Sequence, residues 1–296
     1  MSANVIKLGF LGVNVDRHEE MAEHYGRVLG LPRLEDTKSE VYFSCGSDAY
    51  AISLHRGGPR GYRHLGFQID GEGPLADVQQ RLTALGVNAT IKSDLFSGIP
   101  SCIEISDPDQ YTIYLYRDSA APKRGYADSG IVPDKLGHVA LYVGDAKKTA
   151  SYYEQALGFR WSDWLEDFFV FMRCNSDHHS MNFMSHERRG IFHLAFELHD
   201  WGHVGRSCDV LAQHKVPLIW GPGRHGMGHN LFTYHRDPDG NIVELIADLD
   251  RMSDERLGHF DPRPYHQDFP QKPKVWKRGA MASNIWGVEA SAEFYK

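Results

Sequence analysis

The chain has 296 residues, of which 42% are hydrophobic and 24% are charged, and its formal net charge at pH 7 is −7. The length suits two domains of ordinary size. The acidic balance argues against a nucleic-acid partner or an anionic membrane surface, and no apolar run at either end is long enough for a signal peptide or a membrane span. We therefore expect a cytoplasmic protein that acts on small molecules.

Cysteine and histidine usage narrows the kind of metal site that the chain could hold. The four cysteines are widely spaced and form neither a CxxC pair nor a disulfide framework, so we expect reduced thiols. The 17 histidines favour imidazole and carboxylate ligands, which suit Fe, Mn, Ni or Zn. Composition does not choose among these metals.

An internal repeat organises the predicted elements. The first predicted strand, residues 7–15 (KLGFLGVNV), returns as residues 135–143 (KLGHVALYV). Each strand continues into an amphipathic helix that ends at a Leu-Gly pair, with Gly30 and Gly158 suited to a helix C-cap. Long-period self-similarity of this kind indicates a duplicated structural unit.

The same register continues downstream. Residues 63–67 (RHLGF) match residues 192–196 (FHLAF), and an Asp-Pro-Asp turn recurs, so that every match has an offset of 128 to 130 residues. Each half contains the series strand, helix and several strands twice, with the second helices expected at residues 75–85 and 201–214. The sequence therefore predicts an α+β protein with two domains, each a pair of βαβββ modules.

The domain boundaries follow from composition. Residues 118–134 are rich in proline and glycine, as expected for a linker between the halves. We predict a first domain at residues 1–125 and a second at residues 126–250. The proline-rich remainder, residues 251–296, is expected to be a tail that packs over a domain.

The two halves differ at three strand positions where metal ligands could lie. The corresponding positions carry His138, His193 and Glu244 in the second half and Phe10, His64 and Tyr114 in the first. Two histidines and a carboxylate form a facial triad, which leaves three adjacent coordination positions open and is typical of non-haem Fe(II) sites that activate O₂. One histidine on a strand is more often a core residue than a ligand. Three candidates at corresponding positions favour a metal site in the second half and a metal-free first half.

The sequence resembles the two-domain extradiol ring-cleavage dioxygenases of the vicinal oxygen chelate superfamily, which include catechol 2,3-dioxygenases and dihydroxybiphenyl dioxygenases. The resemblance covers nearly the whole chain and is most specific at residues 221–226 (GPGRHG), at Tyr234 and at residues 237–241 (DPDGN) ahead of Glu244. It implies the two-domain vicinal oxygen chelate fold and Fe(II), with Mn(II) as an alternative. It also implies extradiol (meta) cleavage of a catechol with O₂ to a muconic semialdehyde-type product, in aromatic catabolism, by a homo-oligomer.

The resemblance also implies roles for residues around the metal. Within residues 174–183 (CNSDHHSMNF), His179 corresponds to the acid/base histidine, and we expect the neighbouring His178 to be solvent-exposed or structural. Tyr234 would hydrogen-bond a substrate oxygen, and His225 would orient the groups around it. A surface loop and a strand end would accommodate three further polar residues, to which we assign no role: His229, Asn230 and His235.

The aspartates of residues 237–240 are expected to form a turn and not a calcium site, because the same turn occurs in the metal-free half. Two other functions stay open at this point. One is a metal-dependent isomerase or lyase like glyoxalase, and the other is a metal-free binding protein like the drug-sequestering members of the same superfamily. The sequence does not decide between single-ring and two-ring diols.

Overall fold

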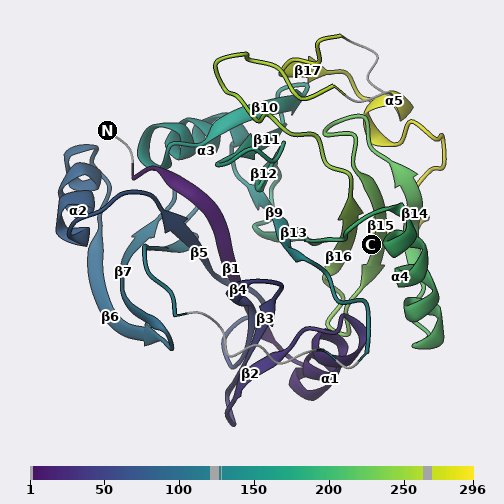
Figure 1. The fold of residues 1–296 in the computed structure, drawn as a ribbon, viewed down its shortest axis with the longest axis horizontal. Helices are drawn as coiled ribbons and strands as arrows, with labels where there is room; N and C mark the ends of the chain where they lie inside the picture. The colour runs from purple at the N-terminus through teal and green to yellow at the C-terminus, as the bar shows by residue number, and fades with distance from the viewer. Residues whose placement is uncertain (1–2, 121–126, 128, 263–268) are drawn as a thin grey trace.

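The computed structural model describes residues 3–120, 127, 129–262 and 269–296, which form two β-sheets lying side by side (Figure 1). The first sheet has the strand order β2-β3-β4-β1-β5-β8-β7-β6. Its strands are β1 (Val5–Val15), β2 (Arg33–Asp36), β3 (Glu40–Cys45), β4 (Asp48–Arg56), β5 (Gly61–Ile69), β6 (Thr90–Phe96), β7 (Ile99–Ser106) and β8 (Thr112–Tyr116). The predicted boundary near residue 125 lies outside the described residues.

The second sheet repeats this arrangement and has the order β14-β15-β16-β13-β9-β12-β11-β10-β17. Its strands are β9 (Lys135–Val143), β10 (Arg160–Leu165), β11 (Phe169–Arg173), β12 (Met181–Ser185), β13 (Gly190–Glu197), β14 (Leu218–Arg224), β15 (Leu231–Arg236), β16 (Ile242–Ala247) and β17 (Lys274–Trp276). Without β17 and read backwards, this order matches the first sheet strand for strand. The predicted α+β class is confirmed, with two βαβββ modules in each sheet.

Helices connect the strands at the positions that the repeat predicts. The helices are α1 (His18–Glu23) with η1 (His24–Val28), α2 (Leu75–Ala84), α3 (Ala146–Tyr152) with η2 (Tyr153–Leu157), α4 (Trp201–Gln213) and α5 (Ala280–Ser283). Gly158 ends η2 with a φ of 81°, a left-handed conformation that glycine adopts without a Cβ penalty. None of the described helices is long and apolar enough to cross a membrane.

One hydrophobic core joins the two halves. Tyr25 of the first half packs on Phe196 of the second, and Phe67 packs on Phe159. The Asp-Pro-Asp turns cross the same interface. Asp239 accepts hydrogen bonds from the backbone N–H groups of residues 16 and 17 at 2.8 and 3.0 Å, whereas Asp109 accepts one from Gly144 at 2.8 Å. Each turn therefore holds the segment ahead of the other half's first helix.

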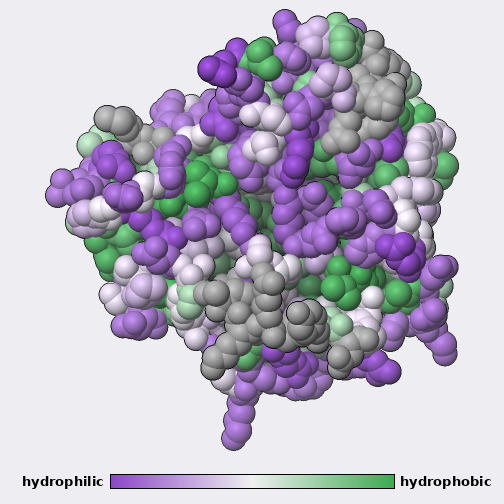
Figure 2. Space-filling model, in the orientation of Figure 1, coloured by the Kyte–Doolittle hydropathy of each residue, from purple (hydrophilic) through white to green (hydrophobic). Residues whose placement is uncertain are grey.

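The described residues of the tail, 251–262 and 269–296, lie along the second half (Figure 1). Strand β17 pairs in parallel with β10 at the edge of the sheet. Further along, Trp220 donates a hydrogen bond to the carbonyl of Val288 at 2.9 Å and packs on Phe294. On the face shown in Figure 2, hydrophilic side chains dominate and apolar ones form separate patches.

A pair of buried histidines at the interface between the halves predicts acid sensitivity. The Nε2 atoms of His24 and His235 lie 3.3 Å apart, and burial lowers the pKa of His24 to about 4, with a further contribution from His214. In the unfolded chain a histidine binds a proton below about pH 6.5. The free energy of unfolding is therefore highest above pH 6.5 and decreases as the pH falls towards 4. The decrease at pH 5 is about 2 kcal/mol for His24 alone.

Between pH 8 and pH 5, we expect the free energy of unfolding to decrease by about 2 kcal/mol less in the His24→Gln variant than in the parent protein. Urea unfolding at the two pH values measures this difference. The control is His199→Gln, because the side chain of His199 is 78% exposed. Equal pH dependence in the His24 variant and the parent would contradict the prediction.

Candidate active site

Three neighbouring strands of the second sheet carry the predicted metal ligands. His138 lies on β9, His193 on β13 and Glu244 on β16. Ala195 of β13 pairs with His138 on one side and with Glu244 on the other. Directly paired residues, and residues two apart on one strand, point to the same face of a sheet. The three side chains therefore converge, and the small Ala195 leaves the space between them open.

The donor atoms of these residues form a small triangle. His138 Nε2 lies 3.0 Å from His193 Nε2 and 2.9 Å from Glu244 Oε2, and His193 Nε2 lies 3.3 Å from the same carboxylate oxygen. Donors that bind one cation at about 2.1 Å and at right angles lie about 3.0 Å apart. The triangle therefore fits one face of a metal octahedron. Among the described residues, no other group of three or more histidine, cysteine and carboxylate side chains has all its donor atoms within 4.8 Å of one another.

The charges of the site suit a divalent cation. Burial alone would raise the pKa of Glu244, but His138, His193 and His225 hold the pKa well below its usual range. Burial lowers the pKa of His193, against the opposing effect of Glu244. The site therefore offers an ionised carboxylate beside a neutral imidazole, away from water. A buried carboxylate is costly without a balancing positive charge, which a bound cation supplies.

His179 stands beside the triangle at the entry to β12. Its ring centroid lies 4.4 Å from that of His138, and the side chain lines the cavity above the ligands. Burial, together with His138 and His178, lowers the pKa of His179 well below its ordinary value. His179 is therefore a neutral imidazole, able to accept a proton. The expectation that His178 is solvent-exposed is wrong, because its side chain is fully buried behind His179.

Tyr234 and His225 form another wall of the site. Tyr234 of β15 pairs directly with Glu244 of β16, and its hydroxyl lies 3.0 Å from His225 Nε2. His225 Nδ1 is bonded to the carbonyl of Ser283 in the tail, which can only accept, so Nδ1 carries a proton. The Nε2 atom of His225 also lies 3.3 Å from Glu244 Oε1. Burial and the nearby Glu244 raise the pKa of Tyr234 well above its usual value. Tyr234 is therefore a protonated phenol.

Sequence reasoning missed polar residues of the site, including Asn230. Asn230, placed on a surface loop by the sequence, is buried and lines the cavity. Its Nδ2 atom lies 3.4 Å from Glu244 Oε1. The surface placement is also wrong for His229, which is buried. His235, expected at a strand end, lies next to the last residue of β15 and is buried as well.

The first half has no equivalent of this site among the described residues. At the position of His138 it carries Phe10, whose ring packs against His64 at 5.6 Å and against Phe96 at 5.0 Å. Burial lowers the pKa of His64 to about 3, with smaller effects from nearby cationic groups. Aromatic side chains therefore fill the space that the second half leaves for ligands.

The cavity above the triangle is largely apolar. Its volume is about 270 Å³. The apolar lining includes Leu165, Phe169, Phe171, Met184, Phe192 and Trp220, and the tail contributes Phe294. No lysine or arginine of the described chain lines it. Among the described residues of the lining, Glu244 is the only carboxylate.

Both halves have the paired βαβββ arrangement of the vicinal oxygen chelate fold, and in the second half three buried donor groups could hold a metal. Residues 135–245 match the family model of the Glyoxalase/Bleomycin resistance protein/Dioxygenase superfamily. The chain is 30% identical to metapyrocatechase 2 of Cupriavidus necator over 60% of its own length and 62% of that protein's. It is 26% identical to 3-methylcatechol 2,3-dioxygenase of Pseudomonas putida, over 81% and 89% of the two chains. These relatives confirm the predicted resemblance to extradiol dioxygenases.

Solved structures agree on the fold. The Mn(II)-bound glyoxalase from Novosphingobium aromaticivorans superimposes with a TM-score of 0.85 at 22% identity, covering 98% of this chain and 94% of that one. The 2,3-dioxygenase LapB from Pseudomonas sp. KL28 gives a TM-score of 0.79 at 23% identity, covering 93% and 98%. Because one is named a glyoxalase and the other a dioxygenase, the fold alone does not select the reaction.

Proposed function

We propose that this protein is a non-haem Fe(II) extradiol dioxygenase that cleaves a catechol ring beside its diol. Both atoms of O₂ enter the product, a muconic semialdehyde-type compound. The observation that carries the proposal is the triangle of His138, His193 and Glu244 donor atoms, with edges of 2.9 to 3.3 Å. A facial triad leaves three adjacent positions open, as many as a bidentate diol and O₂ require.

His138, His193 and Glu244 would hold the metal, and the surrounding residues would handle protons and orientation. When bound, Fe(II) would supply adjacent positions for catechol and O₂ and a path for electrons from the diol to O₂. His179, a neutral imidazole in the cavity wall, would take a proton from a catechol hydroxyl and return it later in the reaction. Tyr234 would hydrogen-bond a substrate oxygen, in an orientation fixed by His225.

The proposal includes iron as the working metal. Names of related proteins include both an iron-dependent extradiol dioxygenase and a manganese-dependent 2,3-dihydroxybiphenyl 1,2-dioxygenase. The ligand set of two imidazoles and one carboxylate accepts either metal. Four free cysteines support a reducing, cytoplasmic location, where Fe(II) is maintained.

The composition of the site favours an oxygenase over the two alternative functions. An isomerase like glyoxalase uses additional glutamates around a closed metal shell, whereas Glu244 is the only acidic side chain among the described residues that line this cavity. A metal-free binding protein has no use for three buried ligands whose donor atoms lie within 4.8 Å of one another.

The apolar cavity predicts the class of catechol. Because no cationic side chain of the described chain lines it, a substrate carboxylate would be buried without a partner, which costs several kcal/mol. We expect kcat/KM for 3-methylcatechol or 2,3-dihydroxybiphenyl to exceed that for 3,4-dihydroxyphenylacetate by at least about 10²-fold.

The test is anaerobic purification with Fe(II), followed by O₂ uptake and near-visible absorbance with this panel of catechols. Stoichiometric O₂ uptake with a yellow product supports ring cleavage, and the order of kcat/KM values tests the preference for uncharged rings. Protein reloaded with Mn(II) serves as the metal control. Bound metal without O₂ uptake for any catechol would contradict the proposed reaction.

A further inference from the structure

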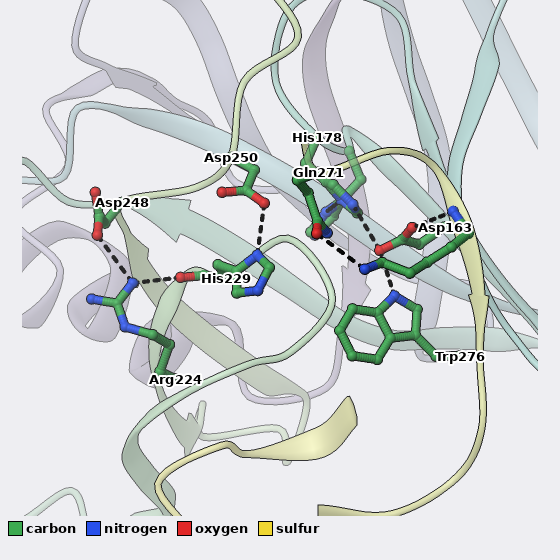
Figure 3. A network of polar contacts seen from close by, with 10 residues as sticks. Asp163, His178, Arg224, His229, Asp248, Asp250, Gln271 and Trp276 are labelled. Atoms are coloured by element: carbon green, nitrogen blue, oxygen red, sulfur yellow. Dashed lines mark hydrogen bonds and ion pairs between the residues drawn. The ribbon is translucent and has the colours of Figure 1, made fainter. Parts of the chain in front are cut away.

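A line of buried polar groups leads away from the candidate active site behind His179. Figure 3 shows two members of this line, His178 and Asp163, together with Trp276. His179 Nδ1 lies 2.9 Å from His178 Nδ1, and His178 Nε2 lies 3.2 Å from Asp163 Oδ2. Asp163 and His178 have no exposed surface, and His179 is 3% exposed. Buried polar groups that are fully hydrogen-bonded fix one arrangement. This line connects strand β10 with the cavity.

Hydrogen-bond chemistry sets the direction of each contact. Asp163 Oδ2 also accepts a hydrogen bond from the indole Nε1–H of Trp276 at 2.7 Å, and Oδ1 accepts one from the backbone N–H of Lys274 at 3.0 Å. A carboxylate with these donors is an acceptor, so His178 donates from Nε2. A His178 ring that carries one proton, on Nε2, keeps a lone pair on Nδ1.

That lone pair determines the tautomer of His179. Because His178 Nδ1 accepts, His179 Nδ1 must be the nitrogen that carries the proton. In a neutral imidazole the other nitrogen is then an acceptor. His179 lines the cavity, and with Nδ1 used behind it, Nε2 is the nitrogen left for a substrate. The opposite tautomer would present an N–H there and could not take a proton.

We propose that Asp163 and His178 are positioning residues that hold His179 in its Nδ1–H tautomer and so make Nε2 the base of the reaction. The inference rests on the proposed function, because it deepens the role of His179 in ring cleavage. The inference also assigns the tail a role in positioning Asp163. Strand β17 pairs Lys274 with Asp163, and two tail donors orient the carboxylate.

A neighbouring pair of the same type provides a matched control. His229 Nδ1 lies 2.8 Å from Asp250 Oδ2, and both side chains are buried close to the line (Figure 3). The backbone carbonyl of Asp250 accepts a hydrogen bond from the backbone N–H of His178 at 2.9 Å. The Asp250→Asn variant therefore changes a buried carboxylate in a similar environment. It leaves the hydrogen-bond acceptors that link Asp163, His178 and His179 unchanged.

The first experiment reads the tautomers directly, in metal-free protein without substrate. Two-bond ¹⁵N–¹H correlation spectra of histidine-labelled protein distinguish Nδ1–H from Nε2–H rings. We expect His179 as Nδ1–H and His178 as Nε2–H, in the parent protein and in Asp250→Asn alike. In Asp163→Asn one acceptor position becomes a donor, and we expect a second His179 species with Nε2–H. A parent His179 found as Nε2–H, or no change in Asp163→Asn, would overturn the inference.

The second experiment separates positioning from packing by two substitutions at one residue. His178→Asn keeps an acceptor near the position of Nδ1, whereas His178→Leu fills similar space without one. We expect His178→Leu to lower kcat by about 10²-fold with KM and iron content within about twofold, and His178→Asn to recover most of the loss. Equal losses in both variants, or a loss that follows iron content, would indicate a packing role.

The two readouts keep this inference distinct from the proposed function. If no catechol is cleaved, ring cleavage fails, but the tautomers of His178 and His179 are still measured. If catechols are cleaved and His179 has the other tautomer, ring cleavage stands and the positioning role fails.

Discussion

Replacing His193 with Ala is expected to abolish metal binding and to lower turnover by at least about 10³-fold, because a metal centre supplies several kcal/mol of stabilisation to its reaction. The substitution removes one corner of the donor triangle and leaves His138 and Glu244, 2.9 Å apart, as a two-point chelate. Metal analysis after Fe(II) loading and O₂ uptake with 3-methylcatechol give the two readouts.

The control for this variant is its counterpart in the first half, His64→Ala. His64 occupies the corresponding strand position but is surrounded by aromatic side chains, including Phe10 and Tyr114. We expect this variant to lose some stability through the cavity that it creates and to retain full metal content. Metal retained by His193→Ala, or lost equally from both variants, would remove the support for a single metal centre in the second half.

Replacing His179 with Ala is expected to lower kcat by about 10²- to 10⁴-fold while iron content stays near normal. The His179 ring packs on His138 at 4.4 Å but is not a corner of the donor triangle, so the metal keeps its three ligands. Steady-state kinetics and iron analysis of the same preparation measure both quantities.

An exposed histidine, replaced in His199→Ala, is the control, and we expect parent-like kcat there. Loss of iron from His179→Ala together with activity would assign His179 to metal retention and not to proton transfer. Normal kcat with normal iron would exclude an acid/base role for His179.

Much of the architecture can be predicted from the sequence because the two halves of the chain can be compared with each other. The repeat predicts two equivalent sets of strands, and equivalent strands place His138, His193 and Glu244 where Phe10, His64 and Tyr114 stand in the other half. Since side chains alternate along strands, their shared face follows from the matched register. The structure brings the three ligand candidates together as this reasoning predicts.

The surroundings of the site could not be predicted because they depend on contacts between distant segments. His235 is buried against His24, which is 211 residues away in sequence. The burial of His178 depends on Asp163 and on Trp276 of the tail. Local sequence periodicity does not indicate contacts between distant segments. A polar residue beside a turn is therefore predicted to lie on the surface. Asn230 was missed for the same reason.

The aromatic filling of the first half also bears on the descent of the chain. In that half, Phe10 pairs with Gly66, and Gly66 pairs with Tyr114, the same register that joins His138, Ala195 and Glu244. His64 is already present. One copy of the repeat therefore keeps the strand register while Phe10 and Tyr114 stand in place of two ligand candidates. Gly66 stands in place of Ala195, and its missing Cβ leaves room for the Phe10 ring.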